Sequence, residues 1–364
     1  ALAALGPELA ERFAPRPVTD VADMGASLGQ VLAAVAEEQP VAVAVDDAHW
    51  ADGPSLAALA SAMSGLGRSR VVLLVTVAEG VGHPPRELAQ LQAEVGRRLP
   101  GVSVRLGPLT ESELGTLVAA LAPWCRADGG RDRLTRRLFV ETGGNPFYAV
   151  TLLGALARAA TLQEDFTTWP PARGTLDAPL PFSVPSLVRH AIAVRVGELD
   201  GGEQAVLRAA SVCGQVLEPE VVAAVAQRPV AEVERALPAF EHRGLVRFDG
   251  RRYVFAAPLV VEAVRAECLS RGDRRRLEER AIAALALRDD LEARALRVEL
   301  MAPVAPGAEV LELAVGVARE ALEAGAVRLA QRALAAAELV IREARLDDAV
   351  IGDLRARLRG RRSA

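Results

Sequence analysis

Lysine is absent from this chain of 364 residues, and asparagine occurs only once, as Asn145. All 43 basic residues are therefore arginine. Without lysine the chain can form no Schiff base, supply no lysine general base and place no lysine on a phosphate-binding loop. A biased genome composition explains the excess of arginine and alanine better than an adaptation does.

Cysteine and histidine are few and scattered, which excludes the common disulfide and metal frameworks. The three cysteines have no CxxC spacing, and we expect buried thiols rather than a disulfide or zinc set. The four histidines form no HExxH motif. These residues are Cys125, Cys213, Cys268, His49, His83, His190 and His242.

Long apolar runs and a strong charge of either sign are also missing. No stretch reaches the roughly 18 to 20 uninterrupted apolar residues that a membrane-spanning helix needs. The formal charge of -4 gives no overall basic field for nucleic acid. We therefore expect a cytoplasmic protein with no membrane partner. The 51% apolar content over this length is enough for more than one domain.

Helical and strand patterns alternate in the N-terminal part of the chain. Short apolar runs at 41–45 and 71–77 predict strands buried on both faces of a parallel sheet, and 102–106 predicts a third strand. Helical spacing over 27–38 and between the first two runs completes the rhythm of a doubly wound α/β domain.

Capping residues mark where two helices begin. Asp52 or Ser55 can cap the helix that follows the first strand, with Pro54 early in it. Thr110 and Glu113 predict a capping box. Beyond that point the pattern is helical, as expected of a lid attached to an α/β core.

Five prolines between 167 and 185 predict a domain boundary there, because this composition sustains neither helix nor central strand. Helical patterns at about 186–198, 202–212, 218–227 and 230–243 follow. Asp249-Gly250 then separates two β-prone runs, which predicts a two-residue hairpin. Helices followed by a hairpin and another helix describe a winged helix.

The region from about 274 to 359 is rich in alanine and helical, with breaks expected at Pro303, Pro306 and Gly325. Segment 318–334 looks like the paired helices of a tetratricopeptide-like array. One such unit does not establish a repeat, so a capping helical bundle remains an equal alternative.

Two adjacent carboxylates, Asp46 and Asp47, follow the first predicted strand directly. Open α/β sheets bind ligands at the carboxyl ends of their strands, and a Walker B strand needs this arrangement. The alternative is that the two residues merely cap a loop or helix.

The longer string decides between these interpretations. An apolar strand followed by Asp46, Asp47, any residue, His49, Trp50, Ala51 and Asp52 resembles the Walker B signature of STAND ATPase domains in large LuxR-type bacterial transcriptional regulators. The resemblance implies that Asp46 binds Mg²⁺ through water beside the nucleotide, and that Asp47 is the catalytic carboxylate.

Two further segments resemble the same family. Gly143-Gly144-Asn145-Pro146 is similar to the glycine-asparagine-proline motif of its lid, although these residues are turn formers in any protein. The resemblance implies that Asn145 and Pro146 lie beside the nucleotide. Segment 253–264 looks like the end of the family's winged-helix domain.

This chain departs from the family pattern at the groups that meet phosphate. Ala257 stands where the family has a phosphate-contacting histidine, and Val261 where it has an arginine. Ala78 replaces an arginine after the second strand. With no lysine and no GxxxxGK[ST] loop, these changes argue against tight nucleotide binding. We expect the loop to precede Ala1 in a longer protein, together with partial loss of phosphate-binding groups.

Arginine clusters at 131–137 and 271–276 are interpreted as solvated helix faces, because acidic residues interrupt or follow the second one.

These patterns and the resemblance predict a multidomain α/β plus α protein. We expect a partial P-loop-type parallel α/β core (1–107), a helical lid (108–165), a proline-rich linker (166–184), a winged helix (185–270) and an all-α tetratricopeptide-like arm (271–364).

The function implied is the regulatory ATP-binding core of a LuxR-type regulator, which does not hydrolyse ATP as the chain stands. ATP or ADP with Mg²⁺ would be the cofactors of the complete protein, and none is assured for this chain. Expected partners are an unknown inducer or protein on the arm, and DNA only through a C-terminal effector domain outside this chain; self-association is a further option. The alternatives are a non-enzymatic scaffold of the same family and, more weakly, DNA binding through the winged helix.

Overall fold

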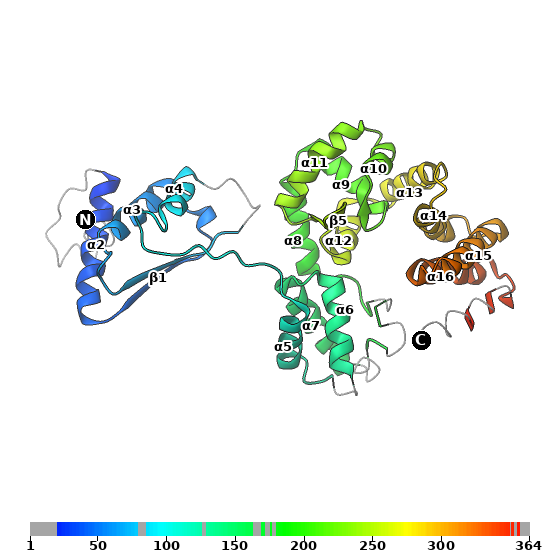
Figure 1. The fold of residues 1–364 in the computed structure, drawn as a ribbon, viewed down its shortest axis with the longest axis horizontal. Helices are drawn as coiled ribbons and strands as arrows, with labels where there is room; N and C mark the ends of the chain where they lie inside the picture. The colour runs from blue at the N-terminus through cyan, green and yellow to red at the C-terminus, as the bar shows by residue number, and fades with distance from the viewer. Residues whose placement is uncertain are drawn as a thin grey trace. The chain divides into compact units, whose positions relative to one another are not determined.

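The computed structural model describes residues 20–78, 85–125, 129–162, 169–171, 175–176, 180–349, 351–352 and 355–356. These residues are mostly helical, with one parallel and one antiparallel sheet. The chain divides into two compact units, Ala1–Gly107 and Pro108–Ala364 (Figure 1). Much of the stretch predicted as a proline-rich linker lies outside the described residues. Within the described ranges, no helix combines the length and apolar character needed to cross a membrane.

The first unit is a two-stranded parallel sheet with helices. Its strands pair in register from Val41 opposite Val71 to Val45 opposite Val75. Its elements are α2 (Val21–Glu38), β1 (Val41–Val45), the 3-10 helix η2 (Ala48–Trp50), α3 (Gly53–Ser64), β2 (Val71–Val75) and α4 (Arg86–Glu94).

Helix α2 begins earlier than its apolar spacing predicts and packs tightly on α3. The Asp20 side chain accepts a hydrogen bond from the Asp23 amide at 2.8 Å and caps the helix. A Cβ at Gly25 would lie 2.6 Å from the Ala58 carbonyl oxygen. Glycine is therefore needed where the two helices approach most closely.

Two expectations about the sheet were wrong. Both strands alternate in burial, and Val72 and Leu74 are 51% and 57% exposed, so one face of the sheet is covered and not both. The run 102–106 is not a strand, and its apolar side chains are 72% to 89% exposed. A strand requires a hydrogen-bonded neighbour, and no strand among the described residues pairs with this run.

The second unit is a chain of packed helices with a small antiparallel sheet of order β3-β5-β4. Its elements are α5 (Glu111–Leu121), α6 (Gly130–Thr142), α7 (Pro146–Leu162), α8 (Ser186–Gly197), α9 (Gly201–Val212), β3 (Val216–Leu217), α10 (Pro219–Ala226), α11 (Val230–His242), β4 (Val246–Phe248), β5 (Tyr253–Phe255), α12 (Pro258–Cys268), α13 (Arg271–Leu285), α14 (Leu291–Val304), α15 (Ala308–Glu323) and α16 (Val327–Ala344).

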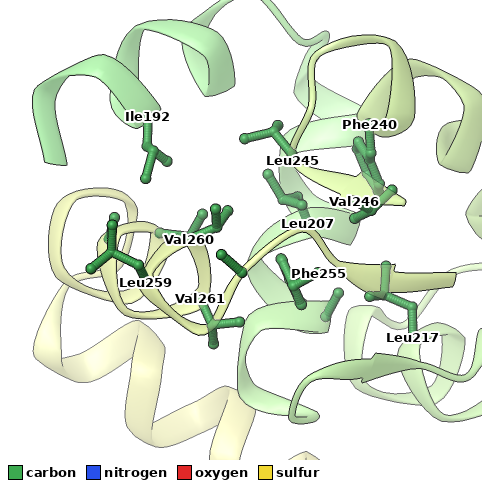
Figure 2. Close-up of a cluster of buried hydrophobic side chains, with 14 of the residues drawn as sticks. Ile192, Leu207, Leu217, Phe240, Leu245, Val246, Phe255, Leu259, Val260 and Val261 are labelled. Carbon is green, nitrogen blue, oxygen red and sulfur yellow. The ribbon is translucent and has the colours of Figure 1, made fainter. Parts of the chain in front are cut away.

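One apolar core runs from α5 to α14. Figure 2 shows its middle, where Leu207 of α9, Phe240 of α11 and Phe255 of β5 gather with side chains from α8 and α12. Phe240 and Phe255 are fully buried. A second core joins α14, α15 and α16.

The expected capping box at Thr110 and Glu113 is present at the start of α5. Glu113 donates its backbone amide to the Thr110 side chain, and its carboxylate accepts from the Thr110 amide.

The hairpin forms where expected, but its turn is shifted by one residue. Phe248 pairs with Tyr253, and the Asp249 amide donates to the Arg252 carbonyl, so Gly250 and Arg251 are the central residues. The Asp249 carboxylate accepts from the backbone amides of Arg251 and Arg252, which explains why aspartate precedes the turn.

The breaks in the C-terminal helices agree only in part. Pro303 lies inside the last turn of α14 rather than ending it. Gly325, at φ 74°, separates α15 from α16 as expected. The second arginine cluster is paired, since Arg274, Arg275 and Arg276 bind Glu278, Glu279 and Asp273.

Candidate functional site

Asp46 and Asp47 lie at the carboxyl end of β1, beside the end of β2. Thr76 follows β2 and binds both residues: its hydroxyl donates to the Asp46 carboxylate and accepts from the Asp47 amide at 2.8 Å. The Thr76 backbone donates to the Val45 carbonyl at 3.0 Å and accepts from the Ala48 amide at 2.9 Å. Because the two parallel strands end at the same edge of the sheet, Thr76 after β2 lies beside the turn that follows β1. This one residue therefore holds the backbone from Val45 to Ala48.

Asp47 adopts a left-handed backbone, with φ 51° and ψ 47°. Its side chain is 63% exposed and does not cap the short helix that follows. Such a backbone costs a residue with a side chain roughly 1–2 kcal/mol, less for aspartate than for most residues. A strained residue that keeps an exposed carboxylate is a candidate functional residue.

His49 is a structural residue that sequence reasoning left without a role. Its side chain is 2% exposed, and its Nδ1 accepts a hydrogen bond from the Ala78 amide at 3.2 Å. Nδ1 also lies 3.9 Å from the Asp47 carboxylate. An Nδ1 that accepts from an amide carries no proton, so this second contact is not an ion pair in that state.

Trp50 lies beside His49 at the surface. The two ring centroids are 5.1 Å apart with the planes tilted by 46°, and Trp50 is 68% exposed. An exposed aromatic residue one helical turn from Asp47 is available to contact a bound molecule, whereas the buried histidine holds the backbone behind it.

Asp52 is engaged as a helix cap, as predicted. Its two carboxylate oxygens accept from the Ser55 amide and the Ser55 hydroxyl, both at 2.8 Å. These hydrogen bonds hold the pKa of Asp52 below its usual value. The third acidic residue of the string therefore stabilises the start of α3 and is not a further member of the Asp46 cluster.

These residues fit only one part of a magnesium site. Asp46 with the Thr76 hydroxyl suits an outer shell bound through water. Over the described ranges, no group of three or more histidine, cysteine or acidic side chains is placed to bind a metal ion. The residues present do not complete a cation site without oxygen ligands from elsewhere.

Asn145 and Pro146 begin α7. The Asn145 side-chain oxygen accepts from the Phe147 amide at 3.0 Å and the Tyr148 amide at 3.3 Å. Asn145 is therefore the N-cap of the helix, and Pro146 occupies its first position, where no amide donor is needed. This geometry explains both residue types by local structure.

The two glycines before Asn145 are required by close backbone contacts. Gly143 and Gly144 have φ 59° and 77°. A Cβ at Gly144 would lie 2.2 Å from the Leu109 carbonyl oxygen, and one at Gly143 would lie 2.5 Å from the Ala256 carbonyl oxygen. The second contact brings this turn against the residues that precede α12, including Ala257, which is 2% exposed.

A buried ion pair supports this turn from α6. The Arg137 guanidinium donates to the Glu141 carboxylate at 2.5 Å, and the two residues are 7% and 3% exposed. Burial, and next the charge of Glu141, raise the pKa of Glu262 on α12, while Arg265 and Arg137 oppose the increase. The spacing of four between Arg137 and Glu141 fits a helical ion pair, but it does not reveal that the pair is buried.

The candidate residues thus form two groups, each within one unit. Asp46, Asp47 and Thr76 meet in the first unit, and Asn145, Pro146 and Ala257 lie around one turn in the second. No protein-family model and no curated protein matches the chain.

Proposed function

We propose that this chain is the regulatory ATP-binding core of a STAND-type ATPase in a LuxR-type transcriptional regulator, and that it acts as a switch without hydrolysing ATP as it stands. One observation carries the proposal: Thr76 clamps Asp46 and Asp47 at the carboxyl ends of two parallel strands. This is the edge at which open α/β sheets bind ligands.

In this proposal Asp46 contributes to a Mg²⁺ shell through water and Asp47 faces the phosphates. The bound metal would neutralise phosphate charge. Asp46 stays oriented by Thr76, and the left-handed backbone of Asp47 directs its carboxylate to solvent at the strand edge. The chain has no lysine, and it has Ala78 where the family resemblance places an arginine, so these groups are not present to hold phosphate. We therefore expect weak nucleotide binding and no ATP hydrolysis.

The second unit would contain the lid, a winged helix and the start of a sensor arm. Helices α9, α10 and α11 with a sheet of order β3-β5-β4 support the winged helix. The turn at Gly143 packs against the segment before α12, which supports a lid that communicates with this domain. Helices α13 to α16 belong to the proposed arm, whose partner is an inducer or protein in the cytoplasm. DNA would be bound by a separate effector domain.

A non-enzymatic scaffold is the second candidate, and the two alanines favour it. Ala78 and Ala257 occupy positions where the family resemblance places phosphate-contacting side chains. The Ala78 amide donates a hydrogen bond to His49, and Ala257 is buried beside Gly143. Both alanines make contacts within the protein, and these contacts do not require a bound nucleotide.

Direct DNA binding is the weaker candidate. The hairpin carries exposed Arg247, Arg251 and Arg252, which favours an anionic partner. However, Glu234 and Glu241 are exposed on α11, the helix that a winged helix would place in the major groove. Acidic side chains there would repel phosphates.

Calorimetry with Mg-ATP on the purified chain tests the proposal. We expect saturable binding with a Kd on the order of 1 mM, which corresponds to about -4 kcal/mol. Binding should require magnesium and disappear in Asp46→Asn, which retains an acceptor for the Thr76 hydroxyl. Glu37→Gln, an exposed change on α2, is the matched control and should bind normally.

Two results would reject the nucleotide site. Absence of any saturable Mg-ATP binding would favour the scaffold, and binding that survives Asp46→Asn would place the nucleotide elsewhere. Salt-dependent binding to duplex DNA would instead revive the third candidate.

A further inference from the structure

The second unit contains a cavity of about 520 Å³ between the winged-helix elements and the helical arm. Its walls come from α10, α12, α13, α14, α16 and the segment 213–218, which contains β3. This volume lies in the range of small-molecule sites, about 300–1,000 Å³. The candidate residues at Asp46 and Asn145 do not line it.

One wall of the cavity is apolar and held by close packing. Gly214, at φ 102°, faces Leu296 of α14, whose two methyl groups would lie 3.6 Å from a Cβ at that glycine. Helix α14 therefore packs directly on the turn before β3. The other apolar lining residues include Val221, Val261, Leu285 and Leu300.

The arginines that line the cavity are already engaged by the protein. Arg332 donates two hydrogen bonds to Glu299, at 2.5 and 2.8 Å. Arg274 donates to Glu278 at 2.7 Å. The Arg265 Nε donates to the Ser211 carbonyl at 2.6 Å. These contacts reduce the ability of the cavity to attract an anion.

Carboxylates outnumber arginines in the lining. The five glutamates are Glu218, Glu262, Glu278, Glu292 and Glu299, against the three arginines. Four of these glutamates bind an arginine of the lining or its surroundings.

Glu262 is the exception. Within the part of the chain that the structure describes, Glu262 has no hydrogen bond or ion pair. Burial and the charge of Glu141 raise its pKa, against the opposing charges of Arg265 and Arg137. Glu262 lines the cavity together with Leu296 and Leu300 of α14. A cation beside it would add an ion pair to the weaker attraction of Arg265 and Arg137, which act on Glu262 without binding it.

We propose that this cavity binds a small organic cation with an apolar body, its ammonium or guanidinium group beside Glu262 and its apolar part against Leu296 and its neighbours. Binding rests on the cavity alone. Only the further step, that such a molecule acts as the inducer of the switch, depends on the proposed function. A ligand here would contact α12, α14 and the turn before β3 together.

Calorimetry with three indole probes tests the charge preference on the intact chain. Tryptamine is a cation, tryptophol is neutral and indole-3-propionate is an anion, while the apolar body is the same. We expect saturable binding of tryptamine at one site, about tenfold tighter than that of tryptophol. Indole-3-propionate should bind most weakly.

Variants locate the site. Glu262→Gln should abolish the preference for tryptamine over tryptophol, whereas Glu279→Gln, which alters an exposed pair on α13, should leave it unchanged. Leu296→Trp should fill the cavity and block both probes. Thermal melts without a probe report whether each variant folds.

Equal affinity for tryptamine and tryptophol, tighter binding of the anion, or no binding of any probe would overturn the proposal. So would a preference that survives Glu262→Gln. The measurement contains no nucleotide, and the Mg-ATP titration contains no probe. Failure of either proposal is therefore distinguishable from failure of the other.

Discussion

Two turns in this molecule adopt left-handed backbone conformations by different means. After α6 the chain passes through Gly143 and Gly144, where neighbouring carbonyl oxygens leave no space for a Cβ. After β1 it passes through Asp47, which has a side chain and leaves it 63% exposed. The first turn requires glycine for steric reasons, and the second is held by hydrogen bonds that Asp47 and Ala48 donate to Thr76.

The difference separates structural from functional candidates. Glycine at the first turn, and Asn145 after it, are explained by backbone contacts and helix capping. Local structure does not explain aspartate at the second turn, since glycine would adopt that backbone more readily. A retained carboxylate at a strained position is the stronger indication of function.

The largest expected effect comes from breaking the buried support of the first turn. Arg137→Met should destabilise the second unit by about 3–5 kcal/mol, because it leaves the Glu141 carboxylate buried without its counter-charge. Hydrogen exchange followed by mass spectrometry over α6 and α7 measures this loss locally.

Two further variants control for the pair itself. Combining Arg137→Met with Glu141→Leu removes both charges and should recover most of the lost stability. Arg275→Met, at an exposed pair with Glu279, should cost at most about 1 kcal/mol. Equal losses for the buried and the exposed arginine would contradict the assigned role of burial.

A smaller loss should follow from adding a methyl group to the first turn. Gly144→Ala should cost about 3 kcal/mol, because its Cβ would meet the Leu109 carbonyl oxygen and its φ is 77°. Gly154→Ala lies in the interior of α7 with only an ordinary contact, and should instead stabilise that helix by about 1 kcal/mol. Opposite signs in thermal melts are expected; a neutral Gly144→Ala would mean that the turn is not built as described.

Local sequence patterns predicted most of the helices. They failed for strand pairing and sheet coverage, because these depend on neighbouring elements. Asp52, Thr110 and the run ending in Asp47 were predictable because capping and short apolar runs are local. The run 102–106 has strand composition but no described neighbour to pair with, and pairing cannot be read from one segment. The exposed face of β1 and β2 has the same cause, since coverage depends on other elements.

The candidate site was predictable as a list of residues and not as an arrangement. The Asp46-Asp47 pair stands out after a strand, but only the fold brings Thr76 from the next strand to bind both residues. Similarly, the motif at Gly143 is visible in the sequence, whereas its contact with Ala256 joins segments far apart along the chain. The Arg137–Glu141 pair fits ordinary helical spacing, but its burial depends on the elements that pack on α6, which include α5, α7 and α12.

The smallest expected effect tests the second turn directly. Asp47→Gly should change local stability by less than about 0.5 kcal/mol, because relief of the left-handed strain offsets the greater freedom of glycine in the unfolded chain. Asp47→Ala should cost about 1 kcal/mol, since alanine tolerates φ 51° less well than aspartate. Hydrogen exchange of the peptide that contains β1 and η2 measures both changes in stability.

Both variants lack the carboxylate, so a loss of Mg-ATP affinity common to the two would report the side chain. A loss confined to Asp47→Ala would report only the backbone. Equal stability of the Asp47→Ala variant and the wild-type chain would contradict the backbone strain from which a function of this turn is inferred.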